Sequence, residues 1–478
     1  MIKTSLTAIA LAAWLVACGT APPLAAPTAA LPTAFAQGQG IDAGGVAQAD
    51  WWTVFADPSL DLLIQRGLQA NLDLQQAAER VQGSRALAAG AQAERGPGGG
   101  VGLDARAQQL SRVEAPGATR DARRSDSVSA AAGLSWEIDL FGRLRTTAEA
   151  ADARARAVES DVGAMQLAVG AEIAHAWFGL NGTRAQLQLA RRVVDNRRTL
   201  LDLVLRRVAA GVASPLDEAR TRTELAAAEA ELPALDAALA VSTHRLAVLL
   251  GVSPSGYEAP AAAHRSPALV ALRLPDPAQW AAQRPDLQAA EARLQALALD
   301  VEAVRAEFLP RLSVAGALGV LAGSVSGLGA AGAAAWFVAP RVSMPVFDHA
   351  RIDARLQVAR AGEREALLAY RQRVLLATEE VESALARVRQ GQLRLASLQE
   401  QARQAVVAGQ LARKRFEAGG TDLLELLDAQ RSTQRAEIEL SVASTEQQQQ
   451  VVGLQRALGA RFLPAGRAAV VGPLQGER

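Results

Sequence analysis

The sequence predicts a mainly α-helical protein that also carries transmembrane β-strands, built as two interleaved copies of one unit. Three observations support this fold class: an internal duplication, a pair of alternating apolar segments in each copy, and long helical stretches with apolar residues every seven positions. Hydrophobic residues make up 50% of the 478 residues but aromatic residues only 4%. Such a composition favours long, thinly packed helices.

The amino-terminal end predicts export and lipid attachment. Lys3 precedes an apolar run, Leu6–Ala17, that is shorter than the roughly 20 residues a membrane span needs, so we expect residues 1–17 to be a signal peptide. The run ends in Leu15-Val16-Ala17-Cys18-Gly19, which resembles a bacterial lipobox. In that motif the cysteine becomes the first residue and carries an N-acyl diacylglycerol. A chance cysteine beside an ordinary cleavage site is the alternative.

Cys18 is the sole cysteine, which excludes a disulfide framework and a cysteine-based metal site. The following residues, 18–50, are rich in Pro, Ala and Gly and almost uncharged. A segment of this composition buries too little surface to fold by itself, so we expect a lipidated flexible tether.

The duplication defines the rest of the chain. Arg206–Gly211 matches Lys414–Gly419 at an offset of 208 positions, whereas Pro97 matches Pro310 at an offset of 213. The first copy therefore has five extra residues between Pro97 and Arg143, where we expect a loop. The first repeat covers residues 51–259, the second covers 260–462, and residues 463–478 form a C-terminal tail. Each repeat should begin with a helix.

Each copy contains a predicted β-hairpin, at about 99–139 and about 311–346. In the first, apolar residues alternate with polar or small ones on both sides of a charged stretch from Arg112 to Asp126. The second, Leu312–Pro340, is uncharged and invites a transmembrane-helix interpretation, but it is rich in glycine and its counterpart clearly alternates. Segments of about ten residues with one apolar face are typical of transmembrane strands.

Four strands cannot close a barrel, because open sheet edges in lipid leave backbone groups unpaired at a cost of several kcal/mol each. The chain must therefore oligomerise. Two copies would supply eight strands and three would supply twelve, and the strand pattern alone favours neither.

Long helical hairpins follow the strands, over 143–250 and 351–458. Heptads such as Leu187, Val194, Leu201 and Val208 predict coiled-coil seams. Turns are expected at Gly211–Pro215 and Gly419-Gly420, and a kink at Pro233.

Several motifs resemble the TolC/OprM outer-membrane factor superfamily, in particular NodT-like lipoproteins of RND efflux systems. They are Trp51-Trp52-x-x-Phe55-x-Asp57-Pro58-x-Leu60, Asn71-x-Asp73-Leu74, Trp136–Arg145, Glu380–Leu385 and Leu426–Arg431. The resemblance implies a homotrimer in the bacterial outer membrane, with a twelve-stranded β-barrel continued by a long α-helical coiled-coil barrel across the periplasm. It implies a passive exit duct for drugs or other small molecules, which docks an inner-membrane RND-type transporter through a periplasmic adaptor protein.

By the same resemblance the turns of the long hairpins are adaptor-docking tips. The residues concerned are Arg207, Gly211 and Ser214 in the first copy, and Arg415, Gly419 and Thr421 in the second. Asp422 is a candidate gate residue, with an exposed helix N-cap as the alternative.

Other functions have less support. The net charge of +1 gives no basis for nucleic-acid binding. The four histidines lack metal-ligand spacing, no phosphate-binding loop or nucleophile elbow is present, and we expect neither catalytic residues nor a metal or cofactor. The carboxylates Glu379, Glu380 and Glu382 are typical of a solvated helix face or an intersubunit ion pair. A channel for type I protein secretion and a lipid-anchored scaffold without a channel remain as alternatives.

Overall fold

The computed structural model describes residues 31–38, 42–43, 50–261 and 273–459. The predicted signal peptide, Cys18 and the predicted tail lie outside these residues. The chain forms two compact units, which we describe separately. One contains residues 91–150 and 293–367, and the other contains residues 50–90, 151–292 and 368–459 together with the short segment 31–38.

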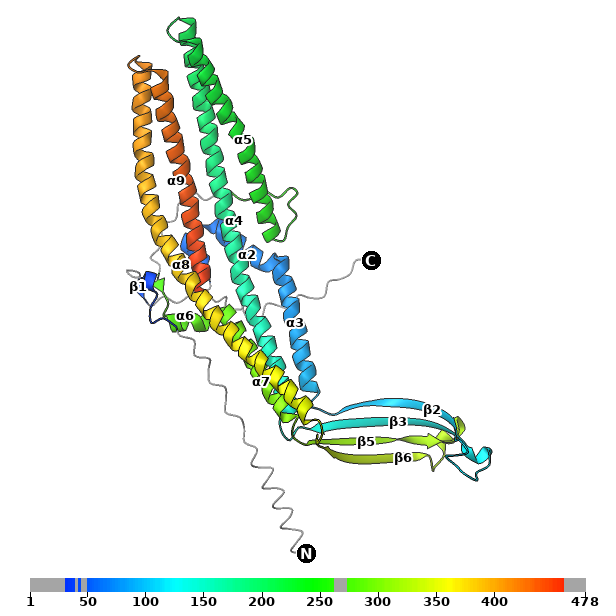
Figure 1. Ribbon diagram of the computed structural model, residues 1–478. Helices are drawn as coiled ribbons and strands as arrows, with labels where there is room; N and C mark the ends of the chain where they lie inside the picture. Colours follow the sequence, from blue (N-terminus) through cyan, green and yellow to red (C-terminus); the bar gives the residue numbers. More distant parts are fainter. Residues whose placement is uncertain (1–30, 39–41, 44–49, 262–272, 460–478) are drawn as a thin grey trace. The chain divides into compact units, whose positions relative to one another are not determined.

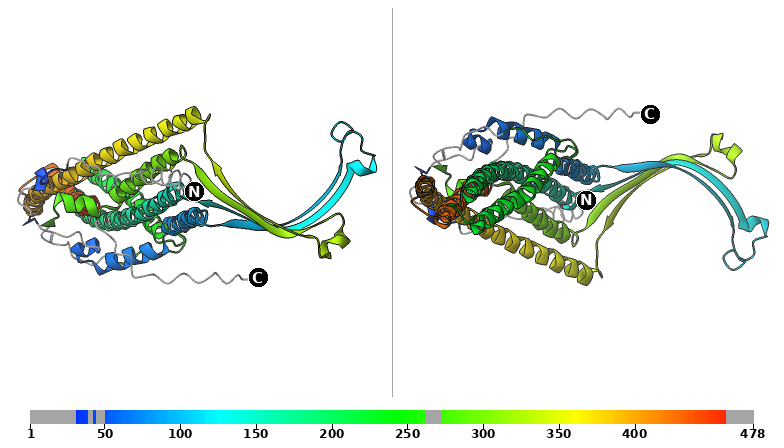
Figure 2. Two further views of the ribbon diagram at one scale, coloured as in Figure 1. Left: turned by 90° about the horizontal axis from the view of Figure 1, so that it is seen from below. Right: turned by 90° about the horizontal axis from the view of Figure 1, so that it is seen from above.

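The first unit contains a four-stranded antiparallel sheet in the order β2-β3-β5-β6. The strands are β2 (Gly98–Gln109), β3 (Arg124–Ile138), β5 (Arg311–Ala322) and β6 (Ala334–Ser343), and Figure 2 shows the sheet to be curved along its strands. Both predicted hairpins are present. Gly98 pairs with Ser135 and Arg311 pairs with Ser343, so the five extra residues of the first copy lie within its hairpin.

The sheet has one continuous apolar face. A row of paired residues crosses all four strands, Val101, Ala132, Leu318 and Trp336, and the rows two residues away are also apolar or glycine. The opposite face carries mainly Gly, Ala, Ser and charged residues. Most apolar-face side chains outside strand β5 are exposed in the single chain, whereas those of β5 are mainly half-buried. Strand alternation is therefore confirmed, and the helix interpretation of Leu312–Pro340 is wrong because backbone pairing joins this segment to β3.

Two strand limits differ from the prediction. Strand β3 begins at Arg124, inside the expected charged loop, because Ser125 and Asp126 pair with Gln108 and Ala107 of β2. Backbone pairing does not require an apolar side chain. Strand β6 ends at Ser343 rather than near Val346, and Pro345 in the following segment has no N–H to donate to a ladder.

The second unit is dominated by two long helical hairpins, which Figure 1 shows side by side. The first joins α4 (Arg143–Ala209) to α5 (Pro215–Leu249), and the second joins α8 (His349–Glu417) to α9 (Leu423–Leu458). α4 and α8 begin in the first unit. At about 1.5 Å per residue, α4 with its 67 residues is on the order of 100 Å long.

The predicted seams lie in the helix contacts, since Leu187, Val194 and Val204 are buried on α4 and Ala402 and Gln447 on the second hairpin. By length and composition α5 is, among the described residues, the one helix apolar enough to cross a membrane. In the structure, ion pairs such as Arg191–Asp236 and Arg198–Glu229 join α5 to α4.

Shorter helices pack around the ends of these hairpins: α2 (Pro58–Ala70), α3 (Leu72–Ala93), α6 (Pro277–Gln283) and α7 (Pro285–Ala306). The family-like motifs have structural roles here. Trp177 donates from Nε1 to Asp57, which also caps α2, over 2.7 Å. Asn71 donates to the Leu249 carbonyl over 2.9 Å. These bonds attach the opening helices to both helices of the first helical hairpin, α4 and α5.

Candidate docking site at the helical tips

The first tip is a tight turn between α4 and α5. Gly211 has a φ of 75°, a left-handed conformation that favours glycine, and Val212 donates its N–H to the Arg207 carbonyl over 2.8 Å. Ser214 begins α5 with a capping box. Its hydroxyl accepts from the Asp217 N–H, and the Asp217 carboxylate accepts from the Ser214 N–H over 3.0 Å. The N–H and the hydroxyl of Ser214 both donate to the Asp217 carboxylate, which lowers the pKa of Asp217.

The second tip repeats this geometry between α8 and α9. Gly419 also has a φ of 75°, and Gly420 donates its N–H to the Arg415 carbonyl over 2.8 Å. Asp422 accepts from the Glu425 N–H over 2.9 Å, which makes it the N-cap of α9. The Thr421 hydroxyl donates to the Glu425 carboxylate, and Arg415 lies 3.4 Å from the same carboxylate.

The duplication explains the position of Asp422. At the offset of 208, Asp422 corresponds to Ser214 and Glu425 to Asp217, so the two N-caps are equivalent. Asp422 is exposed and its carboxylate caps a helix. The N-cap alternative is thus confirmed, whereas the gate role of Asp422 stays a prediction.

Arg207 joins the two tips within one chain. Its guanidinium lies over the Phe416 ring at 4.3 Å from the centroid and donates to the Phe416 carbonyl over 2.9 Å. This carbonyl belongs to the last turn of α8 and also accepts from the Gly419 N–H over 3.0 Å. A buried apolar cluster continues beneath the pair and contains Leu200, Val204, Ala412, Phe416, Leu423, Leu426 and Leu427. Arg207 is therefore a packing residue between tips as well as a predicted docking residue.

Each tip also exposes one leucine. Leu216 and Leu424 correspond in the duplication, and they are 56% and 53% exposed. Each occupies the second position of its helix, beyond the cap. The sequence places both leucines at the ends of the turns, and the offset of 208 pairs them, but it did not identify them as candidate docking residues. The tips thus present polar caps and an apolar side chain together.

A buried charge cluster lies further along the hairpins. Arg197 of α4, whose side chain is 3% exposed, is 3.5 Å from Glu224 of α5 and donates to Gln430 of α9. Arg431 of α9 also pairs with Glu224. The hydrogen bond from Arg431 lowers the pKa of Glu224, and burial lowers the pKa of Arg197. The cluster connects three helices, and no sequence motif predicted it.

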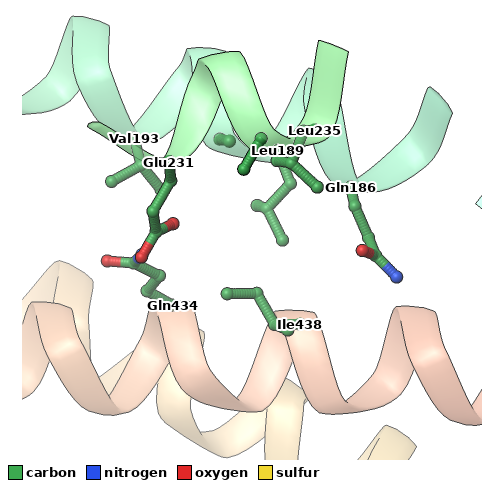
Figure 3. Close-up of a pocket in the computed structure, with 9 residues that line it drawn as sticks. Gln186, Leu189, Val193, Glu231, Leu235, Gln434 and Ile438 are labelled. Atoms are coloured by element: carbon green, nitrogen blue, oxygen red, sulfur yellow. The ribbon is translucent and has the colours of Figure 1, made fainter. Parts of the chain in front are cut away.

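Between this cluster and the opening helices, the two hairpins leave a hollow of about 250 Å³. Figure 3 shows Leu189, Leu235 and Ile438 around it, with Glu231 and Gln434 at one side. Its α5 wall includes the turn that contains Pro233, which lacks the N–H for a helical hydrogen bond. α5 nevertheless continues as one helix through Pro233.

No group of three or more His, Cys, Asp or Glu side chains suited to a metal occurs within residues 31–38, 42–43, 50–261 and 273–459. Of the predicted tip residues, Arg207 contacts the other hairpin, where it donates to the carbonyls of Phe416 and Glu417 at the end of α8.

Comparison with known proteins identifies the family. The model of the family described as "Outer membrane efflux protein" matches residues 63–252 and 277–460. The chain belongs to this family. The outer membrane efflux protein is 34% identical over 457 residues to the pyoverdine export outer membrane protein OpmQ of Pseudomonas putida, covering 93% of the chain and 95% of that protein. It is 33% identical over 479 residues to the outer membrane protein OprJ of Pseudomonas aeruginosa, covering 97% of each.

Among solved structures, that of the outer-membrane channel OprN matches with a TM-score of 0.85 at 34% identity, covering 93% of this chain and 99% of that one. The predicted superfamily and the TolC-like fold are therefore confirmed. This is an outer-membrane transport protein, and the apolar face of its sheet is the face suited to lipid.

Proposed function

We propose that the chain is the passive exit duct of a tripartite efflux pump and works as a homotrimer. The observation that carries the proposal is the four-stranded sheet with one apolar face, whose outer strands β2 and β6 pair with no further strand among the described residues. In lipid, pairing β2 of one copy with β6 of the next would satisfy both edges. Three copies would close twelve strands, an arrangement that requires a head-to-tail ring.

The long hairpins supply the periplasmic part of the duct, and the two tips are the surfaces for a periplasmic adaptor. Support comes from their duplicated caps and from the exposed Leu216 and Leu424. An inner-membrane RND-type transporter would supply the energy. Small molecules are the proposed cargo, because relatives along nearly the whole chain carry names such as pyoverdine export and toluene efflux outer membrane protein. We also propose that Cys18 carries a covalently attached lipid.

The test uses the double variant Leu216→Asp, Leu424→Asp. An acidic residue in the first turn of a helix is favourable, so the hairpins should remain folded while the two exposed leucines of the tips are lost. We expect a normal amount of trimer in the outer membrane and loss of export. The matched control is Leu87→Asp on α3, which is also exposed and far from the tips along the chain. Normal export by the double variant would contradict the docking role.

A deletion of the turn around Gly419 is the stronger version of the same test. The trimer should again reach the outer membrane without supporting export. Export at normal efficiency after this deletion would refute the assignment of the second tip to a partner.

A further inference from the structure

A short segment far from the tips lies on the surface of the second unit. Residues Leu31–Gly38 precede the first repeat, and Phe35 within them is 6% exposed. Its ring meets Trp280 of α6 edge-on, with centroids 5.4 Å apart and planes at 85°. Ala36–Gly38 then form a short 3-10 turn closed by a 3.0 Å bond from the Gly38 N–H to the Phe35 carbonyl. Part of the segment expected to be a tether is thus packed on the body.

A carboxylate of α8 holds the same turn. Glu382 accepts from the Ala36 N–H at Oε1 over 2.7 Å and from the Gln37 N–H at Oε2 over 2.9 Å. The first N–H groups of a helical turn have no partner within it, and hydrogen bonds to an ionised acceptor are stronger than neutral ones. Glu382 therefore binds two backbone donors at once. Its neighbour Glu380 instead pairs with Arg284, so the carboxylate cluster noted in the sequence divides between two structural roles.

A third contact, between Gly38 and Leu274, leaves no room for a side chain at position 38. A side chain on Gly38 would place its Cβ 2.5 Å from Cδ1 of Leu274, which is buried and belongs to β4 (Arg273–Leu274). Just after the turn, β1 (Asp42–Ala43) pairs in parallel with β4. Trp280, Leu274 and Glu382 come from three different elements, and together they form what we call the strap groove.

We infer that the strap groove is a peptide-binding site for this chain's own residues 31–38, which act as a strap. The groove takes an aromatic side chain followed by two free backbone N–H groups and a residue without a side chain, which is the pattern Phe35, Ala36, Gln37, Gly38. The strap fixes the place on the body from which the amino-terminal end departs. This binding is independent of the tips and of the proposed export route.

Hydrogen–deuterium exchange of the full-length protein in detergent tests the inference through the amides of Ala36 and Gln37. They should exchange more than tenfold slower than an unstructured peptide of the same sequence. Phe35→Ala should remove this protection while leaving α6 and α8 unaltered, because the change lies in the strap. Glu382→Ala should remove it from the groove side, and Glu382→Gln, which keeps the shape but loses the charge, should remove part of it.

Glu379→Ala is the matched control, because Glu379 is an exposed carboxylate one turn earlier on α8. It should leave strap exchange unchanged. The inference is overturned if the wild-type amides exchange at the rate of the free peptide. It is equally overturned if Phe35→Ala and Glu382→Ala both leave the exchange as slow as in the wild type.

Discussion

The buried cluster of Arg197, Glu224 and Arg431 should stabilise the junction of the two helical hairpins, and Glu224→Gln tests this. The substitution removes the carboxylate charge beside Arg197, whose side chain is 3% exposed, and leaves it neutral partners such as Gln430. Breaking a buried pair costs about 3–5 kcal/mol, and the lower value applies because the Glu224 side chain is 18% exposed. About 3 kcal/mol corresponds to local opening on the order of 100-fold more frequent.

The control is Glu229→Gln on the same helix. Glu229 pairs with Arg198 over 2.8 Å, but the two side chains are 43% and 59% exposed. An exposed pair contributes about 0.5 kcal/mol, which predicts an effect of about twofold. Native-state hydrogen exchange of α5 amides in the purified protein would measure both variants. Equal effects of Glu224→Gln and Glu229→Gln would refute the argument from burial.

The same comparison predicts a pH dependence. The folded-state pKa of Glu224 lies below its ordinary value because Arg431 donates to the carboxylate. A lowered folded pKa contributes stability that is present above the unfolded value of about 4.3 and disappears as pH falls through the folded value. The difference between wild type and Glu224→Gln should therefore be complete from pH 7 to about 5 and should shrink below about 4.3.

Four further predictions concern the caps, the turns, the sheet and the lipid. Asp422→Ala should lower the free energy of unfolding of the tip by about 1 kcal/mol, whereas Asp422→Ser, which introduces the N-cap residue of the other tip, should not. Thermal unfolding of the two variants measures this difference, which a gate role without helix capping would not produce. Gly419→Ala meets no atom within 4 Å, so its cost of about 1 kcal/mol should come from the φ of 75° alone and show as faster exchange at the turn. Val338→Arg on the apolar face should reduce trimer in outer-membrane fractions, at about 2–4 kcal/mol per chain, while Phe337→Arg on the other face should not. Cys18→Ser should abolish acyl labelling, and unchanged labelling would contradict the lipobox assignment.

The elements were predictable from the sequence because each leaves a periodic trace. Alternation in steps of two located both hairpins, and heptads with Gly211 and Gly419 located the helical hairpins and their turns. The limits moved by a few residues where pairing continued through polar side chains, as at Arg124. Strands, helices and turns of this kind are determined by residues close together in the sequence.

The side-chain clusters were not predictable, because they depend on how distant helices align. Arg197 and Arg431 lie on different hairpins, and heptads determine which face of a helix is buried but not which residues meet across it. The strap was missed for a related reason. Its Pro, Ala and Gly composition indicates that it cannot fold alone, but says nothing of a groove elsewhere that supplies Trp280 and Glu382.

The docked strap determines how much chain separates Cys18 from the first residue that packs on the body. If the chain were held only from Trp51 onward, a lipid on Cys18 would have about 33 residues of free chain, an extended reach on the order of 115 Å. With Phe35 seated against Trp280, only about 13 residues remain between Cys18 and Leu31, a reach on the order of 45 Å. If Cys18 carries the proposed lipid, the strap therefore shortens the connection between lipid and body by more than half.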